Sequence, residues 1–198
     1  MKNLKVIVLA VVVILAISSC SKDDEPAKPP VVEEEVFTTV TAVFTPVGCG
    51  TLVTLTSRDL DGDGPTPPDV TVSGPFALNK TYNGEVTTLD ETKTPIKDMT
   101  DDILELPLEH QLFYVRATGN LPAFTYTPAA VAASNYDVNG KPIGLKTIFT
   151  TGATASAGVL KIILRHEGNK SAANVASGDI TNATGATDFE VDFAIAVQ

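Results

Sequence analysis

After residue 36, hydrophobic and polar residues alternate with a period of two along much of the chain. In residues 189–197, apolar side chains occupy every odd position, and Glu190 and Asp192 occupy two of the even ones. Such alternation predicts a β-strand with one buried face and one partly solvated face. Strands are expected at residues 36–45, 51–58, 70–73, 83–89, 111–118, 123–127, 143–151, 159–166 and 189–197.

Clusters of Gly, Pro, Asn and Asp separate these segments. Residues 45–50, which contain Pro46, Gly48 and Gly50, predict a hairpin, and the Asp-Val-Asn-Gly sequence at 137–140 predicts a turn. Residues 111–118 carry apolar side chains at both parities and are expected to form a central strand. Short strands with turn signals between them predict an all-β fold, an antiparallel β-sandwich of immunoglobulin-like layout.

Only residues 100–106 carry a good helix signal. Thr100 is a candidate N-cap, and Asp101 and Asp102 fall in the first turn, where the helix dipole favours acidic side chains. Pro107 is expected to end or kink the helix. One short helix is therefore expected inside the β domain.

The N-terminus carries an export signal. Lys2 and Lys5 precede an apolar run at residues 6–17. A helix of that length rises only about 18 Å, too little for a bilayer core of about 30 Å, so residues 1–19 predict a signal peptide. Cys20, which follows two serines, resembles the lipid-accepting cysteine of bacterial lipoproteins, and the resemblance implies acylation of Cys20. An ordinary signal peptide beside an incidental cysteine is the alternative.

Residues 20–35 are expected to form an acidic, Pro-rich tether, and residues 36–198 the β-sandwich domain. The Ser-Lys-Asp-Asp-Glu sequence at 21–25 resembles the surface-export signal of Bacteroidota lipoproteins. This resemblance implies an outer-membrane location, attached through lipid on Cys20 and facing the cell exterior. A charged spacer on a periplasm-facing lipoprotein is the alternative.

Charge and cysteine content narrow the range of partners. The formal net charge of −10 argues against nucleic acid and against direct docking on anionic headgroups. If Cys20 is acylated, Cys49 has no partner within the chain. Cys49 lies between two glycines and is most simply an incidental small residue.

An acidic loop at residues 59–69 is the first candidate metal site. Asp59, Asp61 and Asp63 alternate before Gly64, and Asp69 follows. Alternating carboxylates beside a glycine at the sixth position resemble the start of an EF-hand loop, so calcium is the expected ion. The twelfth position, however, is Val70 rather than a bidentate Glu. An acidic turn without a metal ion is the alternative.

The two histidines are the second candidate site. His110 follows Glu109, and His166 precedes Glu167. Each histidine lies at the end of a predicted strand. If these strands meet at one end of the sandwich, the four side chains converge and could bind zinc, or the two histidines could bind a haem. The alternative is a pair of hydrogen-bonded residues at the rim of the core.

Nothing in the sequence favours catalysis. There is no Gly-x-Ser-x-Gly nucleophile motif, and two histidines without a paired nucleophile do not define a triad. The chain also contains no Trp, the residue that sugar-stacking platforms favour. A non-catalytic binding or accessory role is therefore expected, and a metal- or haem-binding lipoprotein is the alternative.

Four stretches together resemble a family of small Bacteroidota lipoproteins sometimes labelled "type 1 periplasmic binding fold superfamily". They are residues 58–64 (RDLDGDG), 109–114 (EHQLFY), 164–170 (LRHEGNK) and 178–183 (GDITNA). The resemblance implies a lipoprotein that serves an outer-membrane transporter. The label itself implies two α/β lobes with long helices, which this short, β-rich chain does not suit. Pro107 also departs from the more helical acidic segment of the family.

Overall fold

The computed structural model describes residues 35–62 and 64–198. The predicted signal peptide, Cys20, all but the last residue of the tether, and Asp63 lie outside the described residues. Within the described part of the chain, no helix is long and apolar enough to cross a membrane.

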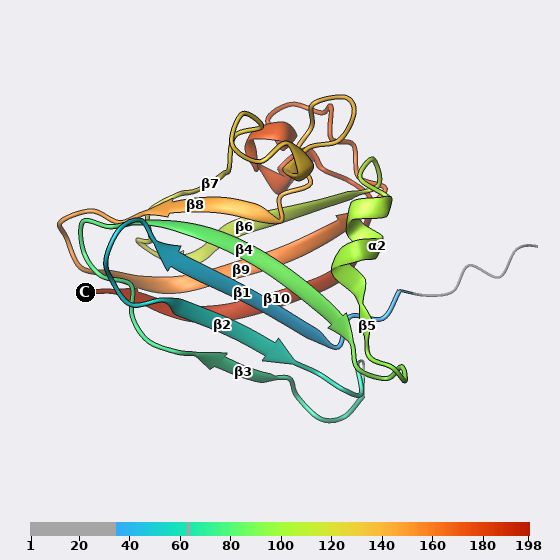
Figure 1. Ribbon diagram of the computed structural model, residues 1–198, viewed down its shortest axis with the longest axis horizontal. Coiled ribbons are helices and arrows are strands. Elements are labelled where there is room, and N and C mark those ends of the chain that lie inside the picture. Colours follow the sequence, from blue (N-terminus) through green and yellow to red (C-terminus); the bar gives the residue numbers. More distant parts are fainter. Residues whose placement is uncertain (1–34, 63) are drawn as a thin grey trace, which may run out of the picture. The chain divides into compact units, whose positions relative to one another are not determined.

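The described residues form two antiparallel sheets (Figure 1). One sheet has the order β3-β2-β1-β4-β8-β7, with β5 paired to β4, and the other has the order β10-β9-β6. The strands are β1 (Thr39–Pro46), β2 (Val53–Arg58), β3 (Asp69–Val72), β4 (Thr81–Asp90), β5 (Lys97–Asp98), β6 (His110–Gly119), β7 (Phe124–Tyr126), β8 (Lys146–Thr150), β9 (Ser156–His166) and β10 (Ala186–Val197).

The predicted all-β antiparallel sandwich with one short helix is confirmed. Every predicted strand has a counterpart, and residues 45–50 connect the antiparallel pair β1 and β2 as expected. The two sheets divide the strands into seven and three, less evenly than the four and three of a constant-type immunoglobulin domain.

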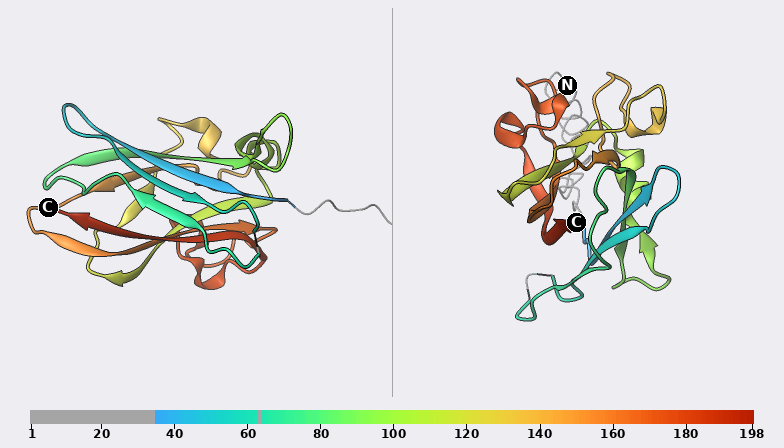
Figure 2. Two further views of the ribbon diagram at one scale, coloured as in Figure 1. Left: turned by 90° about the horizontal axis from the view of Figure 1, so that it is seen from below. Right: turned by 90° about the vertical axis from the view of Figure 1, so that its left-hand side faces the viewer.

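The core lies between the two sheets, which form separate layers in Figure 2. Phe44, Phe76 and Phe149 are fully buried and contact one another edge to face. Leu160 and Phe193 from the smaller sheet belong to the same cluster. The alternation seen in the sequence therefore buries one face of each sheet against the other.

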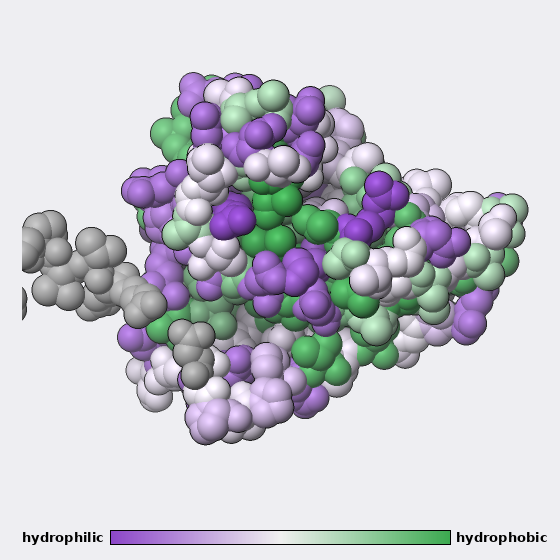
Figure 3. Space-filling view, turned by 180° about the vertical axis from the view of Figure 1, so that it is seen from behind, coloured by the Kyte–Doolittle hydropathy of each residue, from purple (hydrophilic) through white to green (hydrophobic). Residues whose placement is uncertain are grey.

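Strand β6 lies at an edge of its sheet, so the prediction of a central strand at residues 111–118 was wrong. Its second apolar face is covered by loops rather than by neighbouring strands. Phe113 and Ile163 pack there against Val175 and Ala183, which lie in the loops after β9. Seen from behind, hydrophobic residues gather where these loops meet the body of the domain (Figure 3).

Helix α2 (Met99–Glu105) packs beside β4 and ends before Pro107, as predicted. Its N-cap is Asp98 rather than the expected Thr100, because the Asp98 carboxylate accepts a hydrogen bond from the Thr100 N–H. The Thr100 hydroxyl instead accepts a bond from the Thr88 N–H at 2.9 Å. Thr100 therefore attaches the helix to β4.

A buried ion pair fixes the loops near the end of α2. The Lys170 ammonium lies 3.3 Å from Oδ2 of Asp137 and also donates to the carbonyl of Pro107. Burial lowers the pKa of Lys170, while Asp137 opposes that shift. Asp137 in turn accepts hydrogen bonds from two backbone N–H groups of the predicted 137–140 turn region. The Lys170–Asp137 pair therefore attaches the segment after α2 to the neighbouring loops.

Candidate metal centre

The two histidines meet at one end of the smaller sheet, as the sequence predicted. His110 is the first residue of β6, His166 is the last residue of β9, and they are direct partners in the antiparallel register. Directly opposed residues project on the same face of a sheet. The imidazole rings accordingly lie edge to face, with centroids 4.7 Å apart.

Two carboxylates complete the cluster. Asp188 lies where the register of β10 shifts between Thr187 and Phe189, so it is the extra residue of a β-bulge beside His166. Bulges redirect side chains at strand ends. Glu35 comes from the coil that precedes β1. The four side chains Glu35, His110, His166 and Asp188 each offer one ligand atom, and these atoms all lie within 4.8 Å of one another.

The distances suit a small tetrahedral ion. Nε2 of His110 lies 3.2 Å from Oε2 of Glu35 and 3.7 Å from Oδ2 of Asp188. Nδ1 of His166 lies 3.6 Å from Oε2 of Glu35 and 3.5 Å from Oδ1 of Asp188. Bonds of about 2.0–2.2 Å from zinc to nitrogen or oxygen give a tetrahedron with edges of about 3.3–3.6 Å. The four distances, which involve both oxygens of Asp188, are therefore similar to the edges of a zinc site.

The ring nitrogens that face away from the cluster also have partners. Nδ1 of His110 donates to the carbonyl of Leu106 at 3.2 Å, which directs the Nε2 lone pair of a neutral ring into the cluster. Nε2 of His166 lies 3.5 Å from Oε2 of Glu109. Partners of this kind orient metal-binding imidazoles. Glu109 therefore has the position of an orienting carboxylate rather than that of a ligand.

Asp188 is a buried carboxylate with an incomplete set of hydrogen-bond partners. Its Oδ2 atom is buried and accepts no hydrogen bond from the described residues. Burial raises the pKa of Asp188, although the two nearby histidines oppose this shift. Buried carboxylates are normally paired, hydrogen-bonded or bound to metal. An ion between the four side chains would supply the missing partner.

The ring spacing also distinguishes between the predicted ligands. A haem held by two axial histidines places its porphyrin plane and two metal–nitrogen bonds between the rings. Here His110 and His166 are in edge-to-face contact, with ring centroids 4.7 Å apart, so a porphyrin does not fit between them.

The acidic loop at residues 59–69 differs from the histidine cluster in how its carboxylates are arranged. Oδ2 of Asp61 accepts a hydrogen bond from the Thr66 N–H at 3.2 Å, and this bond lowers the pKa of Asp61. Asp69 lies on β3, paired with Arg58. In the described part of the chain Asp59, Asp61 and Asp69 do not form a ligand group, while Asp63 is outside it. The calcium site stays a prediction.

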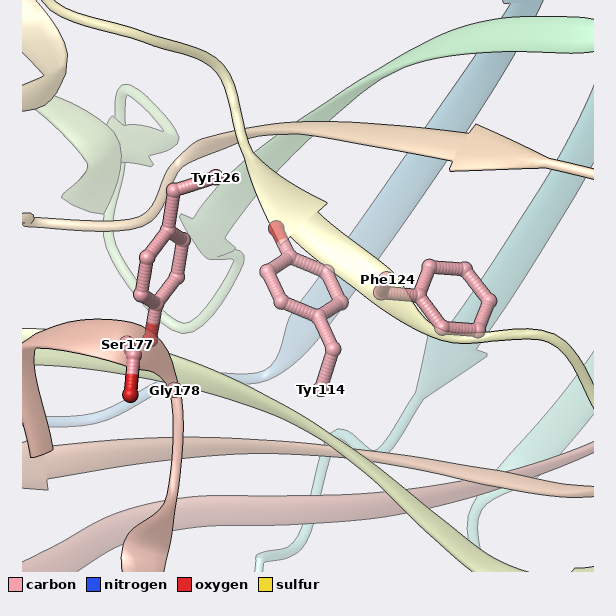
Figure 4. A pocket seen from close by; sticks show the side chains of 5 residues that line it. All are labelled: Tyr114, Phe124, Tyr126, Ser177 and Gly178. Carbon is pink, nitrogen blue, oxygen red and sulfur yellow. The ribbon is translucent and has the colours of Figure 1, made fainter. Parts of the chain in front are cut away.

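A shallow aromatic hollow lies between β6, β7 and the loop at η2 (Val175–Ser177) (Figure 4). The hollow is partly open to solvent and has room for about one water molecule. The Tyr114 and Tyr126 hydroxyls donate to backbone carbonyls at 2.7 and 2.6 Å, so both are already engaged. The side chains around the hollow therefore stabilise the packing of the loops. The hollow is lined by Tyr114, Phe124, Tyr126, Ser177 and Gly178.

Sequence reasoning located the two histidines and Glu109 but missed Glu35 and Asp188. Glu167, the fourth residue expected to converge, is exposed and forms a second group of potential ligands with Glu109 and His166, whose ligand atoms also lie within 4.8 Å of one another. No local pattern singles out these two ligands, because Asp188 lies at the bulge of β10 and Glu35 lies in the coil before β1. Cys49 is exposed and forms no disulfide within the described residues.

No family model matches the chain, and neither a curated protein nor a solved structure shows significant similarity to it.

Proposed function

We propose that this chain is an exported, lipid-anchored protein whose β-sandwich binds one divalent transition-metal ion. The ligands are Glu35, His110, His166 and Asp188. The observation that carries the proposal is the orphaned Oδ2 of Asp188 in a cluster of four potential ligand atoms that all lie within 4.8 Å of one another. A proton on Nε2 of His110 would satisfy Glu35 at 3.2 Å and still leave Oδ2 of Asp188 at 3.7 Å without a hydrogen bond. A metal ion would contact all four side chains.

Zinc is the ion that fits this donor set best. Two neutral imidazoles and two carboxylates carry a charge of −2, which a divalent cation balances. Imidazole suits zinc, copper, iron and nickel, whereas calcium and magnesium take oxygen ligands. Four protein ligands at tetrahedral spacing are typical of zinc.

The cellular setting is proposed from the sequence. The apolar run at 6–17 and the resemblance around Cys20 support acylation and an outer-membrane location, and the acids at 23–25 support exposure to the cell exterior. Growth with labelled palmitate tests this part. Label is expected in the wild-type protein and absent after Cys20→Ala. Unlabelled wild-type protein would contradict the anchor without bearing on the metal site.

Metal binding is tested on the full-length chain, purified in detergent and stripped with a chelator. Calorimetry with zinc is expected to give one ion per chain, and elemental analysis the same stoichiometry after dialysis. His166→Ala is expected to abolish tight binding, because it removes a ligand from a partly exposed strand end without opening the core.

Asp192→Ala is the matched control for the metal experiment. Asp192 also lies on β10, but its carboxylate is exposed and pairs with Lys161 at 3.0 Å. The control is expected to bind zinc as the wild type does. If the wild-type protein neither retains zinc nor gains thermal stability from it, the cluster is an ion-pair network and the proposed function is wrong.

An accessory role for an outer-membrane transporter is a second candidate. One observation favours it. At the end of α2 and just after it, the three leucines at alternate positions are exposed: Leu104, Leu106 and Leu108. Exposed apolar groups of this kind occur at protein interfaces. Cross-linking in intact cells is expected to give a defined adduct with a membrane protein, and Leu108→Glu should reduce it. An adduct unchanged by that substitution would contradict this role for the segment.

A further inference from the structure

The four ligands of the proposed site are not held equally. His110, His166 and Asp188 lie on adjacent strands of one sheet, where backbone pairing and the bulge fix their positions. Glu35 lies in coil, and the first backbone hydrogen bond within the described chain is donated by Thr38. Three ligands therefore belong to a rigid frame, and the fourth is supplied by a connecting segment.

Contacts of the neighbouring residues show how that segment is attached. The Phe37 ring contacts the Phe189 ring edge to face, with centroids 5.4 Å apart. The Thr38 N–H and hydroxyl both bond the carbonyl of Leu89. Phe37 and Thr38 thus hold the coil close to the frame, but nothing described fixes the Glu35 carboxylate except the two imidazoles. Glu35 can leave the site without breaking a strand.

We infer, on the basis of the proposed metal function, that Glu35 is an exchangeable ligand whose position at the metal accepts an external carboxylate. A site with three protein ligands and one exchangeable position is the arrangement by which zinc proteins bind small ligands. The frame carries one carboxylate and two neutral imidazoles, so a divalent ion on it has a net charge of +1. That charge selects an anion for the fourth position.

The burial of the ligands supports this assignment. The side chain of His110 is fully buried and that of Asp188 is 12% exposed, whereas those of Glu35 and His166 are 20% and 27% exposed. Of these two more exposed ligands, His166 is fixed by strand pairing and Glu35 is not. Departure of Glu35 would therefore open the metal toward solvent on the side of the coil.

The test uses full-length protein loaded with cobalt, whose visible spectrum reports the number and type of ligands, and acetate as the external carboxylate. Glu35→Ala is expected to bind one cobalt ion per chain with reduced affinity. Loss of a residue that only orients a ligand lowers metal affinity by about 10- to 100-fold, and loss of Glu35 should lower it at least as much. Millimolar acetate should change the spectrum of this variant and recover part of the lost affinity. The wild type should need far more acetate for the same change, because its own Glu35 competes.

Glu85→Ala is the matched control, since Glu85 is an exposed glutamate paired with Lys146 at 2.8 Å. It should behave as the wild type does. The inference is overturned if Glu35→Ala binds cobalt as tightly as the wild type with the same spectrum. It is also overturned if that variant, folded by circular dichroism, loses the metal and acetate does not restore it. Wild-type protein that binds no cobalt or zinc would instead show that the proposed function itself is wrong.

Discussion

The histidine cluster and the acidic loop both contain carboxylates, but Asp188 and Asp61 have pKa values shifted in opposite directions. Oδ1 of Asp59 in the loop, like Oδ2 of Asp188, has no hydrogen-bond partner among the described residues. At the loop, the backbone N–H of Thr66 lowers the pKa of Asp61. Just beside it, Arg58 and Thr39 lower the pKa of Glu91 to about 2. At the cluster, burial raises the pKa of Asp188, and its Oδ2 atom accepts no hydrogen bond from described residues.

The difference shows which carboxylates are available for a cation. A carboxylate whose charge is already satisfied by internal donors gains less from a metal than one that is buried and unsatisfied. A cluster of acids in the sequence is therefore a weaker indication of a metal site than a carboxylate aimed at two imidazoles from a bulge.

The largest effect is expected for His110→Ala. The imidazole is fully buried, and its loss leaves a cavity and removes the contacts of Nε2 with Glu35 and Asp188 and of Nδ1 with the Leu106 carbonyl. We expect about 3 kcal/mol of lost stability in metal-free protein, measured by urea unfolding. Asp61→Ala, which removes an exposed turn bond, should cost less than about 1 kcal/mol. Equal losses in the two variants would contradict the contrast between the regions.

Asp188→Asn should act in opposite directions on the metal-free and zinc-bound protein. It keeps the shape of the side chain but removes a buried charge whose Oδ2 atom has no hydrogen-bond donor among the described residues. Metal-free protein is expected to unfold at an equal or higher urea concentration. Zinc affinity should fall by about 10- to 100-fold, or about 1.4–2.7 kcal/mol. Calorimetry and urea unfolding measure the two effects separately.

A variant that loses both stability and zinc affinity would show that Asp188 serves mainly to hold the histidines. Asp192→Asn is the control on the same strand, because the Asp192 carboxylate is exposed and pairs with Lys161. It should change neither quantity.

Glu91→Gln should give a pH-dependent loss of stability. The Arg58 guanidinium donates to both carboxylate oxygens, at 2.9 and 2.8 Å, and lowers the Glu91 pKa from 4.5 to about 2. A lowered pKa contributes stability above pH 4.5 and loses it as the pH falls toward 2. The variant should therefore unfold at lower urea than the wild type at pH 7, and the difference should shrink between pH 4.5 and 2. A difference independent of pH would contradict this cause.

Much of the fold was predictable from the sequence because the signals were local. Period-two alternation located the strands, and Pro107 located the end of α2. The position of β6 was not predictable. Phe113 is buried by Val175 and Ala183, residues far along the chain, and a strand buried by loops has the same pattern as a central strand.

The site was predictable only in part for the same reason. Strand ends and parity brought His110 and His166 together, because antiparallel register follows from local pattern. The position of Asp188 depends on a bulge, which shifts the parity of the strand by one residue. The alternation of apolar and polar residues does not reveal such a shift. Glu35 depends on the path of the coil before β1. Both ligands reach the site through tertiary structure that no local pattern specifies.

The smallest effect concerns the acidic loop and calcium. Extracellular calcium modules bind with dissociation constants of about 0.1–1 mM. At calcium twice the dissociation constant, a site here would add only about 0.6 kcal/mol, which raises the melting temperature by about 1–3 °C. Calorimetric melting of zinc-saturated protein with and without calcium measures this shift, and Asp61→Asn should remove it while Asp192→Asn should not. An unchanged melting temperature in the wild type would identify the loop as an acidic turn, with Asp61 committed to the Thr66 N–H, and would leave the histidine cluster as the candidate metal site of the described chain.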